Sequence, residues 1–305
     1  MSESSGLLFP GQGAQYVGMG ADLYERYDEA RETYDRATDL LELDIRRISF
    51  EGPEEELRQT RFTQPAILVH SLAVLAALPD RSAAAAAGHS LGEYPALFAA
   101  GVLDFDSVVK LVKRRAALMG DEGEKNPGTM AAIIGLESED VEKLCDEVDG
   151  TVVPANYNEP LQTVVSGEIE AVKRVAELAS EQGARKAVML PVSGAFHSPL
   201  LTESAASFAD FIEGFEFREP SCPVIVNVTG RIAGSATELK SSLTKQLISP
   251  VRWVDTMAEA VRLDIGTFLE PGPGRVLTGL ARRINRSLKV TPVGTADQVE
   301  ALRSD

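Results

Sequence analysis

The sequence predicts an α/β protein: a large hydrolase-like subdomain built on a parallel sheet, with a small ferredoxin-like subdomain inserted into it. Two glycine-rich turns each follow a short apolar segment, which predicts parallel strands that end at one edge of a sheet. One turn, GHSLG at 88–92, has the G-x-S-x-G spacing of a nucleophile elbow. Between 127 and 193 the expected element order is β-α-β-β-α-β, typical of a split βαβ unit. We therefore expect a large subdomain over 1–126 and 194–305, and a small one over 127–193.

Length and composition narrow the class of protein. Of the 305 residues, 44% are hydrophobic, which is enough for a substantial core. The first residues lack the basic start and apolar stretch of a secretory signal. The longest apolar run, at 65–78, is too short to span a bilayer and contains His70, so it predicts a buried helix. The two cysteines, Cys145 and Cys222, lie far apart without metal-ligand spacing, and we expect a reducing cytoplasm.

The formal charge of −16 argues against nucleic acid or an anionic membrane as a partner. An acidic partner requires a local basic patch, and LARRINRSLK at 280–289 is one candidate. A helix whose basic residues simply face solvent is the alternative, and the sequence favours that interpretation.

The first part of the chain predicts a strand followed by helices. Residues 7–9 form a short apolar strand before the Pro-Gly turn of FPGQG. Helical patterns follow over 21–41 and 53–59, and then the buried helix over 65–78.

The alanine run at 83–87 is ambiguous by itself. Alanine favours helix, but this segment is short and apolar and runs directly into GHSLG. We therefore predict a buried parallel strand. A helix to Ala100 follows the turn, and another spans 106–119.

The middle of the chain supplies the inserted subdomain. Its expected elements are, in order, a strand at 128–135, a helix at 138–148, strands at 151–158 and 161–167, a helix at 168–183 and a strand at 186–193. The remaining chain predicts helices, a strand at 223–230 and a strand-turn-helix unit at 266–284.

Ser90 at the tip of the elbow is the candidate nucleophile, and an ordinary loop serine is the alternative. A serine hydroxyl requires a base to remove its proton, and the chain has three histidines. His70 lies in the apolar helix and is expected to be a satisfied core residue. His89 precedes the nucleophile, so its side chain is expected to pack beneath the turn. His197 lies in a polar loop at the subdomain junction and is the candidate base.

Serine chemistry also requires donors for the oxyanion. At an elbow the first donor is the amide after the nucleophile, that of Leu91. Gly11 and Gly13 leave the backbone around Gln12 exposed as a second donor, although a plain strand-to-helix connector is the alternative.

Eight segments of the chain together resemble the malonyl-CoA:acyl carrier protein transacylases of fatty acid synthesis. They also resemble the acyltransferase domains of polyketide synthases. These segments are, in order, FPGQGAQYVGMG, TQPAI, GHSLGEYPALFAAGVL, GTMAAIIGL, NYNEPLQTVVSG, PVSGAFHSPL, QLISPVRW and EPGPGRVLTGL. The resemblance covers nearly the whole chain, and it implies the same two-subdomain architecture.

The resemblance implies a role for each candidate residue. Ser90 is then the acylated nucleophile and His197 its base, and the amides of Gln12 and Leu91 form the oxyanion hole. Gln246 holds the far nitrogen of His197 through its backbone carbonyl, so the resemblance demands no acidic triad member.

The resemblance also assigns substrate contacts. It implies that Arg115 binds the free carboxylate of the substrate. Without the resemblance, Arg114 fits the sequence pattern equally well. A planar guanidinium suits a carboxylate because it donates two parallel hydrogen bonds. Phe196 leaves little room beside the substrate's α-carbon, which favours malonyl over methylmalonyl groups.

The expected reaction is transfer of malonyl from malonyl-CoA to the phosphopantetheine thiol of acyl carrier protein. The substrate and this partner protein suffice, and no cofactor or metal is expected; the family favours a monomer. The alternatives are a serine esterase or thioesterase, a polyketide acyltransferase, and a non-catalytic module that docks carrier proteins.

Overall fold

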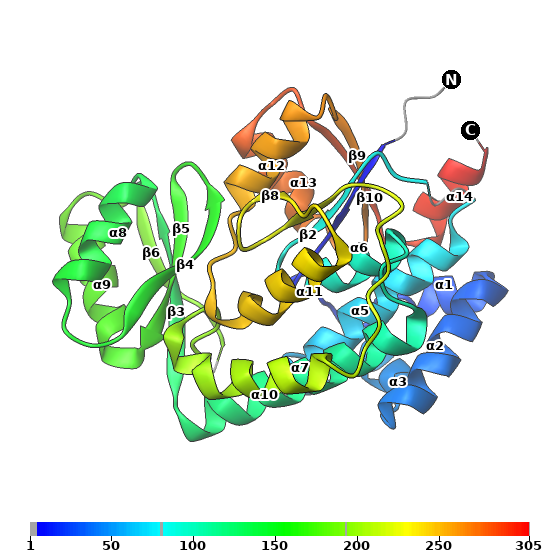
Figure 1. Ribbon diagram of the computed structural model, residues 1–305, viewed down its shortest axis with the longest axis horizontal. Coiled ribbons are helices and arrows are strands. Elements are labelled where there is room, and N and C mark those ends of the chain that lie inside the picture. Colours follow the sequence, from blue (N-terminus) through cyan, green and yellow to red (C-terminus); the bar gives the residue numbers. More distant parts are fainter. Residues whose placement is uncertain (1–4, 80–81, 193, 305) are drawn as a thin grey trace.

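Two separate sheets organise the chain in this computed structural model, which describes residues 5–79, 82–192 and 194–304. The six-stranded sheet has the order β10-β9-β1-β2-β7-β8, and the four-stranded sheet the order β4-β5-β3-β6. In Figure 1 the four-stranded sheet, with α8 and α9, lies at the left, away from the larger sheet. The strands of the larger sheet are β1 (Gly6–Phe9), β2 (Ala86–Gly88), β7 (Val224–Val226), β8 (Arg231–Ile232), β9 (Thr267–Pro271) and β10 (Lys289–Val293).

The centre of the larger sheet is parallel. Strand β1 pairs in parallel with both β2 and β9, while only the β7–β8 pair is antiparallel. Leu7 and Phe9 of β1 face the main core, and Leu8 faces a second core on the opposite side of the sheet. Helices cover both faces, which explains why the central strands are uniformly apolar. The carboxyl ends of β1 and β2 therefore lie side by side, as the two glycine-rich turns predict.

Helices from distant parts of the chain cover the two faces. The helices before the small sheet are α1 (Ala21–Arg26), α2 (Asp28–Leu41), α3 (Ile45–Phe50), α4 (Glu54–Leu57), α5 (Thr60–Ala77), α6 (Glu93–Ala99) and α7 (Phe105–Lys125). Those after it are α10 (Thr202–Ile212), α11 (Ala236–Lys245), α12 (Trp253–Arg262), α13 (Val276–Ile284) and α14 (Ala296–Ser304). Helices α5, α6 and α7 contribute to the main core, and α12 and α13 contribute to the second.

The small sheet confirms the predicted β-α-β-β-α-β order. Its elements are β3 (Gly128–Ile134), α8 (Ser138–Glu147), β4 (Val152–Glu159), β5 (Gln162–Glu168), α9 (Ile169–Glu181) and β6 (Lys186–Met189). All of its pairings are antiparallel, and the two helices bury a third core against it. The subdomain boundaries at 127 and 193 stay predictions.

Strand β6 is shorter than the predicted 186–193. It ends at Met189, because Leu190 and Val192 leave the sheet and line a cavity between the two sheets. Ser193, the last residue of the predicted strand, lies outside the described residues.

Three other predictions of single elements need correction. The helix predicted over 21–41 is two helices, because Tyr27 between them is extended, with φ −121° and ψ 122°. Only the last part of the alanine run forms strand, since β2 begins at Ala86. The buried helix begins at Thr60 rather than at Pro65.

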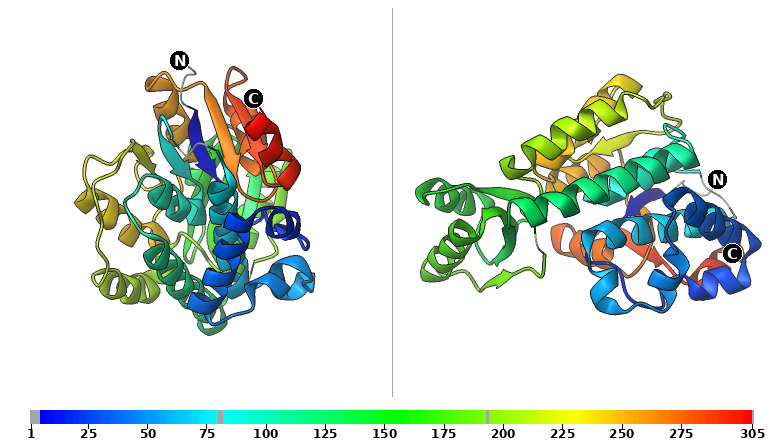
Figure 2. Two further views of the ribbon diagram at one scale, coloured as in Figure 1. Left: turned by 90° about the vertical axis from the view of Figure 1, so that its right-hand side faces the viewer. Right: turned by 90° about the horizontal axis from the view of Figure 1, so that it is seen from below.

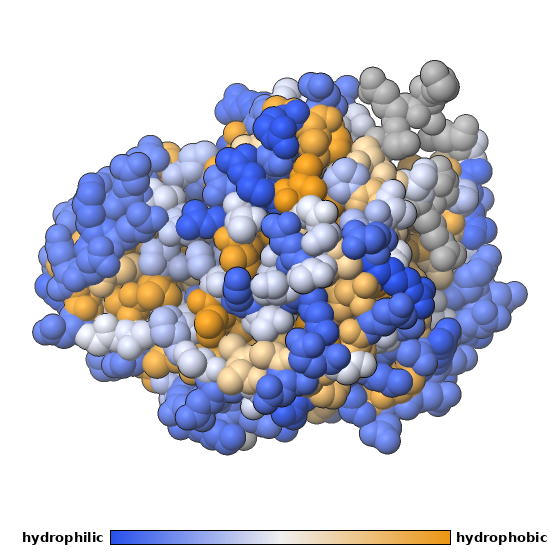
Figure 3. Space-filling view, in the orientation of Figure 1, coloured by the Kyte–Doolittle hydropathy of each residue, from blue (hydrophilic) through white to orange (hydrophobic). Residues whose placement is uncertain are grey.

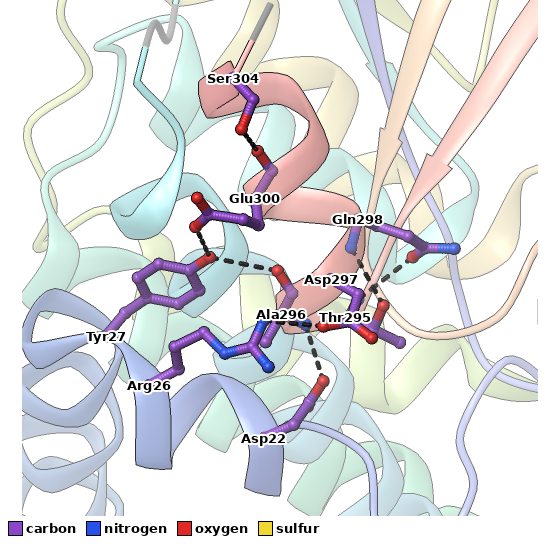
Figure 4. Close-up of polar contacts among 9 residues, drawn as sticks. All are labelled: Asp22, Arg26, Tyr27, Thr295, Ala296, Asp297, Gln298, Glu300 and Ser304. Atoms are coloured by element: carbon purple, nitrogen blue, oxygen red, sulfur yellow. Dashed lines mark hydrogen bonds and ion pairs between the residues drawn. The ribbon is translucent and has the colours of Figure 1, made fainter.

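The sequence analysis missed α3, β8, β10 and α14. Helix α14 packs on α1. Both helices lie at the end of the molecule opposite α8 and α9 (Figure 2). Figure 4 shows these contacts: Asp22 accepts from the backbone amide of Ala296 at 2.7 Å, and Arg26 pairs with Asp297 at 2.7 Å. The Tyr27 hydroxyl donates to the Ala296 carbonyl, which places the residue that separates α1 and α2 against the C-terminal helix.

Hydrophilic residues cover most of the visible face of the molecule, with apolar patches between them (Figure 3). Among the described residues, no helix has both the length and the apolar character that crossing a membrane requires.

Candidate active site

Ser90 stands at a sharp turn between β2 and the short 3₁₀ segment that leads into α6. Its φ of 52° lies in the left-handed region, which is costly for a residue other than glycine. A Cβ at Gly88 would lie 1.9 Å from the Gly92 carbonyl oxygen, and one at Gly92 would lie 2.0 Å from the Phe9 oxygen. Both positions therefore require glycine, and the close backbone approach holds Ser90 at the tip of the turn.

His197 contacts the Ser90 hydroxyl directly. The distance from Ser90 Oγ to His197 Nε2 is 2.8 Å. The other ring nitrogen, Nδ1, lies 2.9 Å from the Gln246 carbonyl oxygen and 3.0 Å from that of Ser249. Carbonyl oxygens only accept hydrogen bonds, so the proton sits on Nδ1 and Nε2 is free to accept the serine proton. Burial, and after it the charge of Arg115, lower the pKa of His197 to about 3, which keeps the ring neutral.

Arg115 brings a buried positive charge to the same hydroxyl. Its side chain on α7 is 1% exposed, whereas that of neighbouring Arg114 is exposed. Nη2 donates to Ser90 Oγ and to Gln246 Oε1, each at 3.0 Å, and Nη1 donates to Gln64 Oε1 at 2.7 Å. Within the described residues, Nε has no hydrogen-bond partner. The guanidinium is thus held in a fixed orientation and keeps donor capacity for a ligand.

Asn227, at the end of β7, holds the backbone of the elbow. Its Oδ1 accepts from the Ser90 amide and its Nδ2 donates to the Gly88 carbonyl, both at 2.7 Å. On the other side of the turn, Gln246 Nε2 donates to the Ser90 carbonyl at 3.0 Å. The sequence analysis missed Asn227, and the only local signal was its place within the predicted strand 223–230.

Glu93 is a second residue that the sequence analysis missed. Its side chain is fully buried, and its Oε2 accepts from Gln246 Nε2 at 2.7 Å and from the Asn227 amide at 3.2 Å. Burial raises the pKa of Glu93 to about 7, against the opposing effect of these hydrogen bonds and of Arg115.

A cavity of about 110 Å³ lies in front of Ser90. The side chains of both sheets meet here, because β3 and the segment after β6 face the carboxyl ends of β1 and β2. Its lining residues are Gln12, Gln64, His89, Ser90, Leu91, Arg115, Met119, Met130, Asn156, Leu190, Val192, Phe196 and His197. On the small-sheet side the lining is apolar except for Asn156, and around Ser90 it is polar, which suits a small acyl group with one charged end.

The structure thus brings together the residues predicted for catalysis and for substrate contact. Gln12, Leu91, Phe196 and His197 line one cavity with Ser90, and Gln246 lies directly behind it.

The other two histidines lie apart from the Ser90 hydroxyl. His89 is bonded through Nε2 to Asn158 at 2.8 Å, and its ring packs on Trp253, although it also borders the cavity. His70 is a core residue with no exposure, and burial lowers its pKa to about 4. His70 is thus a core residue as expected, and its nearest polar partner is the backbone of Gly294.

Comparison with known proteins places the chain among acyltransferases. The acyl transferase domain family matches residues 7–302. A malonyl CoA-acyl carrier protein transacylase of Staphylococcus aureus (strain MRSA252) is 40% identical over 297 residues, covering 96% of both chains. The corresponding protein of Bacillus subtilis (strain 168) is 39% identical over 298 residues, covering 96% of this chain and 94% of that one.

Solved structures agree with these relatives. A malonyl-CoA:acyl carrier protein transacylase from Xanthomonas oryzae pv. oryzae has a TM-score of 0.94 at 38% identity, covering 100% of this chain and 99% of that one. A malonyl-transacylase in complex with a type II polyketide synthase acyl-carrier protein has a TM-score of 0.95 at 39% identity, covering 99% of this chain and 100% of that one.

Proposed function

This chain belongs to the acyl transferase domain family, and we propose that it transfers malonyl from malonyl-CoA to acyl carrier protein through an ester on Ser90. The relatives named malonyl-CoA:acyl carrier protein transacylases support this proposal. One observation carries the proposal: the Ser90 hydroxyl lies within hydrogen-bond distance of both a neutral histidine and a buried arginine. The histidine supplies a base for the serine, and the arginine supplies a partner for the malonyl carboxylate.

In the first half-reaction, Ser90 Oγ attacks the thioester carbon while His197 Nε2 accepts its proton. Charge develops on the carbonyl oxygen, and the amides of Gln12 and Leu91 are the proposed donors to it. The tetrahedral intermediate then collapses: the carbon–sulfur bond breaks, and the CoA sulfur leaves with the proton from His197. The products are malonyl-Ser90 and free CoA.

The second half-reaction reverses these steps with another thiol. His197 accepts the proton of the phosphopantetheine thiol, whose sulfur attacks the ester carbon. The ester bond breaks, and Ser90 Oγ recovers the proton from His197. The chemistry uses the two substrates and protein side chains from one chain, so it calls for no cofactor and no second copy. We place it in the cytoplasm, in keeping with the free thiols Cys145 and Cys222.

An esterase with the same elbow is the main alternative, and Arg115 distinguishes the two. A hydrolase of simple esters gains nothing from a buried guanidinium beside its nucleophile, whereas a malonyl group carries a carboxylate that matches it. Phe196 lines the cavity and is 6% exposed, in keeping with the proposed exclusion of a methyl branch on the substrate.

Mass spectrometry of the intact protein tests the proposal. After mixing with malonyl-CoA, we expect a stable malonyl adduct that disappears when acyl carrier protein is added and reappears on the carrier. Rapid loss of the adduct to water identifies a hydrolase, and no adduct at all identifies a docking module.

We expect Arg115→Ala to lower the malonyl transfer rate by about 100-fold and to abolish the preference for malonyl-CoA over acetyl-CoA. The variant loses the hydrogen bonds to the malonyl carboxylate, while acetyl-CoA has no carboxylate to lose. Arg115→Lys should recover only part of the rate, because an ammonium cannot reproduce the planar fork. The measurement compares both acyl-CoAs in transfer assays.

Arg114→Ala is the matched control, since it removes the same charge from an exposed neighbouring position. A malonyl preference that survives Arg115→Ala places the carboxylate contact elsewhere.

The carrier protein needs its own contact surface, and an open groove of about 1060 Å³ between the two sheets offers one. The groove is lined by Arg282, Arg283 and Arg286 on one side and by Arg185 on the other. Arg283 pairs with Glu159, while within the described residues the other three have no acidic partner. Strand β4 connects this groove to the active site, because Asn156 lines the catalytic cavity three residues before Glu159. We infer that the groove binds an acidic face of the carrier protein, and three of its arginines come from the basic segment 280–289.

We expect the double variant Arg282→Glu/Arg286→Glu to raise the KM for the carrier protein by at least about 10-fold, with a smaller effect at high salt. The rate of malonyl-enzyme formation at saturating malonyl-CoA should stay unchanged. Lys110→Glu, an exposed position outside the groove, is the control for the charge change. Equal losses in both half-reactions show instead that the groove binds the CoA phosphates.

A further inference from the structure

Glu93 is a buried acid that the reaction described above does not use. Its carboxylate does not border the catalytic cavity, and none of its hydrogen bonds reaches a reacting atom. An ionisable group with no exposure is costly to bury unless it is paired. Its contacts therefore point to a role beyond packing.

The Glu93 carboxylate is one of three groups, with Arg115 and the Ser90 carbonyl, that fix the orientation of the Gln246 amide. A carboxylate only accepts hydrogen bonds, so Gln246 must turn Nε2 toward it and Oε1 away from it. Oε1 then faces Arg115 Nη2 at 3.0 Å, and Nε2 also reaches the Ser90 carbonyl at 3.0 Å. With the amide reversed, two donors would face each other at Arg115, and the Ser90 carbonyl would lose its donor.

The same carboxylate also holds the opposite side of the elbow. Its Oε2 accepts from the amide of Asn227, whose side chain bonds to the Ser90 amide and the Gly88 carbonyl. Gln246 in turn accepts from His197 Nδ1 through its backbone carbonyl. Glu93 thus bonds to Gln246 and Asn227. These two residues in turn bond to the backbone of Ser90, and Gln246 also bonds to His197 and Arg115.

We propose that Glu93 is a positioning residue for malonyl-Ser90 formation, whose carboxylate fixes the orientation of Gln246 and Asn227 and thereby aligns Ser90, His197 and Arg115. This inference rests on the proposed function, since it concerns how that site is held. Glu93 acts only through these neighbours and touches neither substrate nor reacting atom.

The arrangement predicts a dependence on pH. The charged or titratable groups near Glu93 are Arg115 from α7, Tyr94 from α6 and, beyond Gln246, His197. Within the described residues Oε1 of Glu93 has no hydrogen-bond partner, so a proton added there removes the charge and weakens the hydrogen bonds that Oε2 accepts from Gln246 and from the Asn227 amide. Because its pKa is raised to about 7, the acylation rate should fall as the pH drops through neutrality. Burial lowers the pKa of His197 to about 3, so this ring should titrate well below neutrality.

The test is single-turnover acylation at malonyl-CoA concentrations up to saturation, measured from about pH 5.5 to pH 9. Glu93→Gln should lower the rate at high pH by about 10- to 100-fold with little change in KM, and its rate should not vary through neutrality. Glu122→Gln is the matched control: it neutralises another buried carboxylate, bonded to Ser204 and Asn126 away from the site, and should leave the rate and its pH profile unchanged.

A swapped variant separates orientation from net charge. Glu93→Gln/Gln246→Glu keeps one carboxylate and one amide in contact, but it places the carboxylate against Arg115. We expect no recovery of the rate, because that carboxylate occupies the contact required by malonyl. Melting curves check that each variant folds, and if Glu93→Gln does not fold, Glu93→Asp, whose shorter arm weakens the contact with Gln246, replaces it.

Three results would overturn the inference: Glu93→Gln acylates like the unmodified protein, it retains the decline at low pH, or the swapped variant recovers the rate. The proposed function fails in a different way, through the absence of malonyl-Ser90 in the unmodified protein.

Discussion

Ser90→Ala is expected to abolish malonyl transfer, with a loss of at least about 10⁴-fold, because no other described residue that lines the cavity carries a hydroxyl or thiol. The substitution removes one oxygen from the tip of a turn whose shape depends on Gly88 and Gly92. The backbone hydrogen bonds from Asn227 and Gln246 do not involve the hydroxyl, so the fold should be retained.

Two measurements check this expectation. The intact mass of the variant should show no adduct after malonyl-CoA is added, and its melting temperature should match that of the unmodified protein. Ser180→Ala, on the exposed face of α9, serves as the control. Persistent transfer, or an adduct on another residue, means that Ser90 is not the nucleophile.

His197→Ala should lower the acylation rate by about 10³- to 10⁴-fold, because a serine hydroxyl is nearly unreactive at neutral pH without a base. The loss should appear in both half-reactions, since the same Nε2 accepts and returns the proton each time. Separate assays of malonyl-enzyme formation and of malonyl transfer to the carrier protein measure the two losses.

The pH profile refines this expectation. With its pKa lowered to about 3, His197 is neutral throughout the range in which the protein is assayed, and protonation disables it only at strongly acidic pH. A variant without His197 should therefore be slow at every pH, whereas loss of Glu93 should remove a dependence centred near neutrality. Near-normal acylation by His197→Ala assigns the base to another group.

Local patterns in the sequence were sufficient for the fold class, and they pointed to Ser90 as the candidate nucleophile. The close glycine spacing around Ser90 is a requirement of the backbone itself, since a Cβ at either glycine meets a carbonyl oxygen. The β-α-β-β-α-β order could likewise be predicted, because alternation, helical spacing and turn residues are properties of short segments. The break at Tyr27 and the helix α14 could not, because contacts between the two ends of the chain hold them in place.

The supports of the site were decided by the tertiary structure alone. In the sequence, Arg114 and Arg115 are neighbouring arginines of one predicted helix and cannot be told apart. The packing of α7 against α5 buries Arg115 and leaves Arg114 exposed. The roles of Asn227 and Glu93 likewise could not be predicted, because their hydrogen-bond partners are distant in the sequence and no local pattern indicates them. By itself the sequence determined which backbone turn presents Ser90, because the shape of that turn depends on neighbouring residues. Which side chains hold the turn in place depends on contacts between distant segments, which only the folded chain creates.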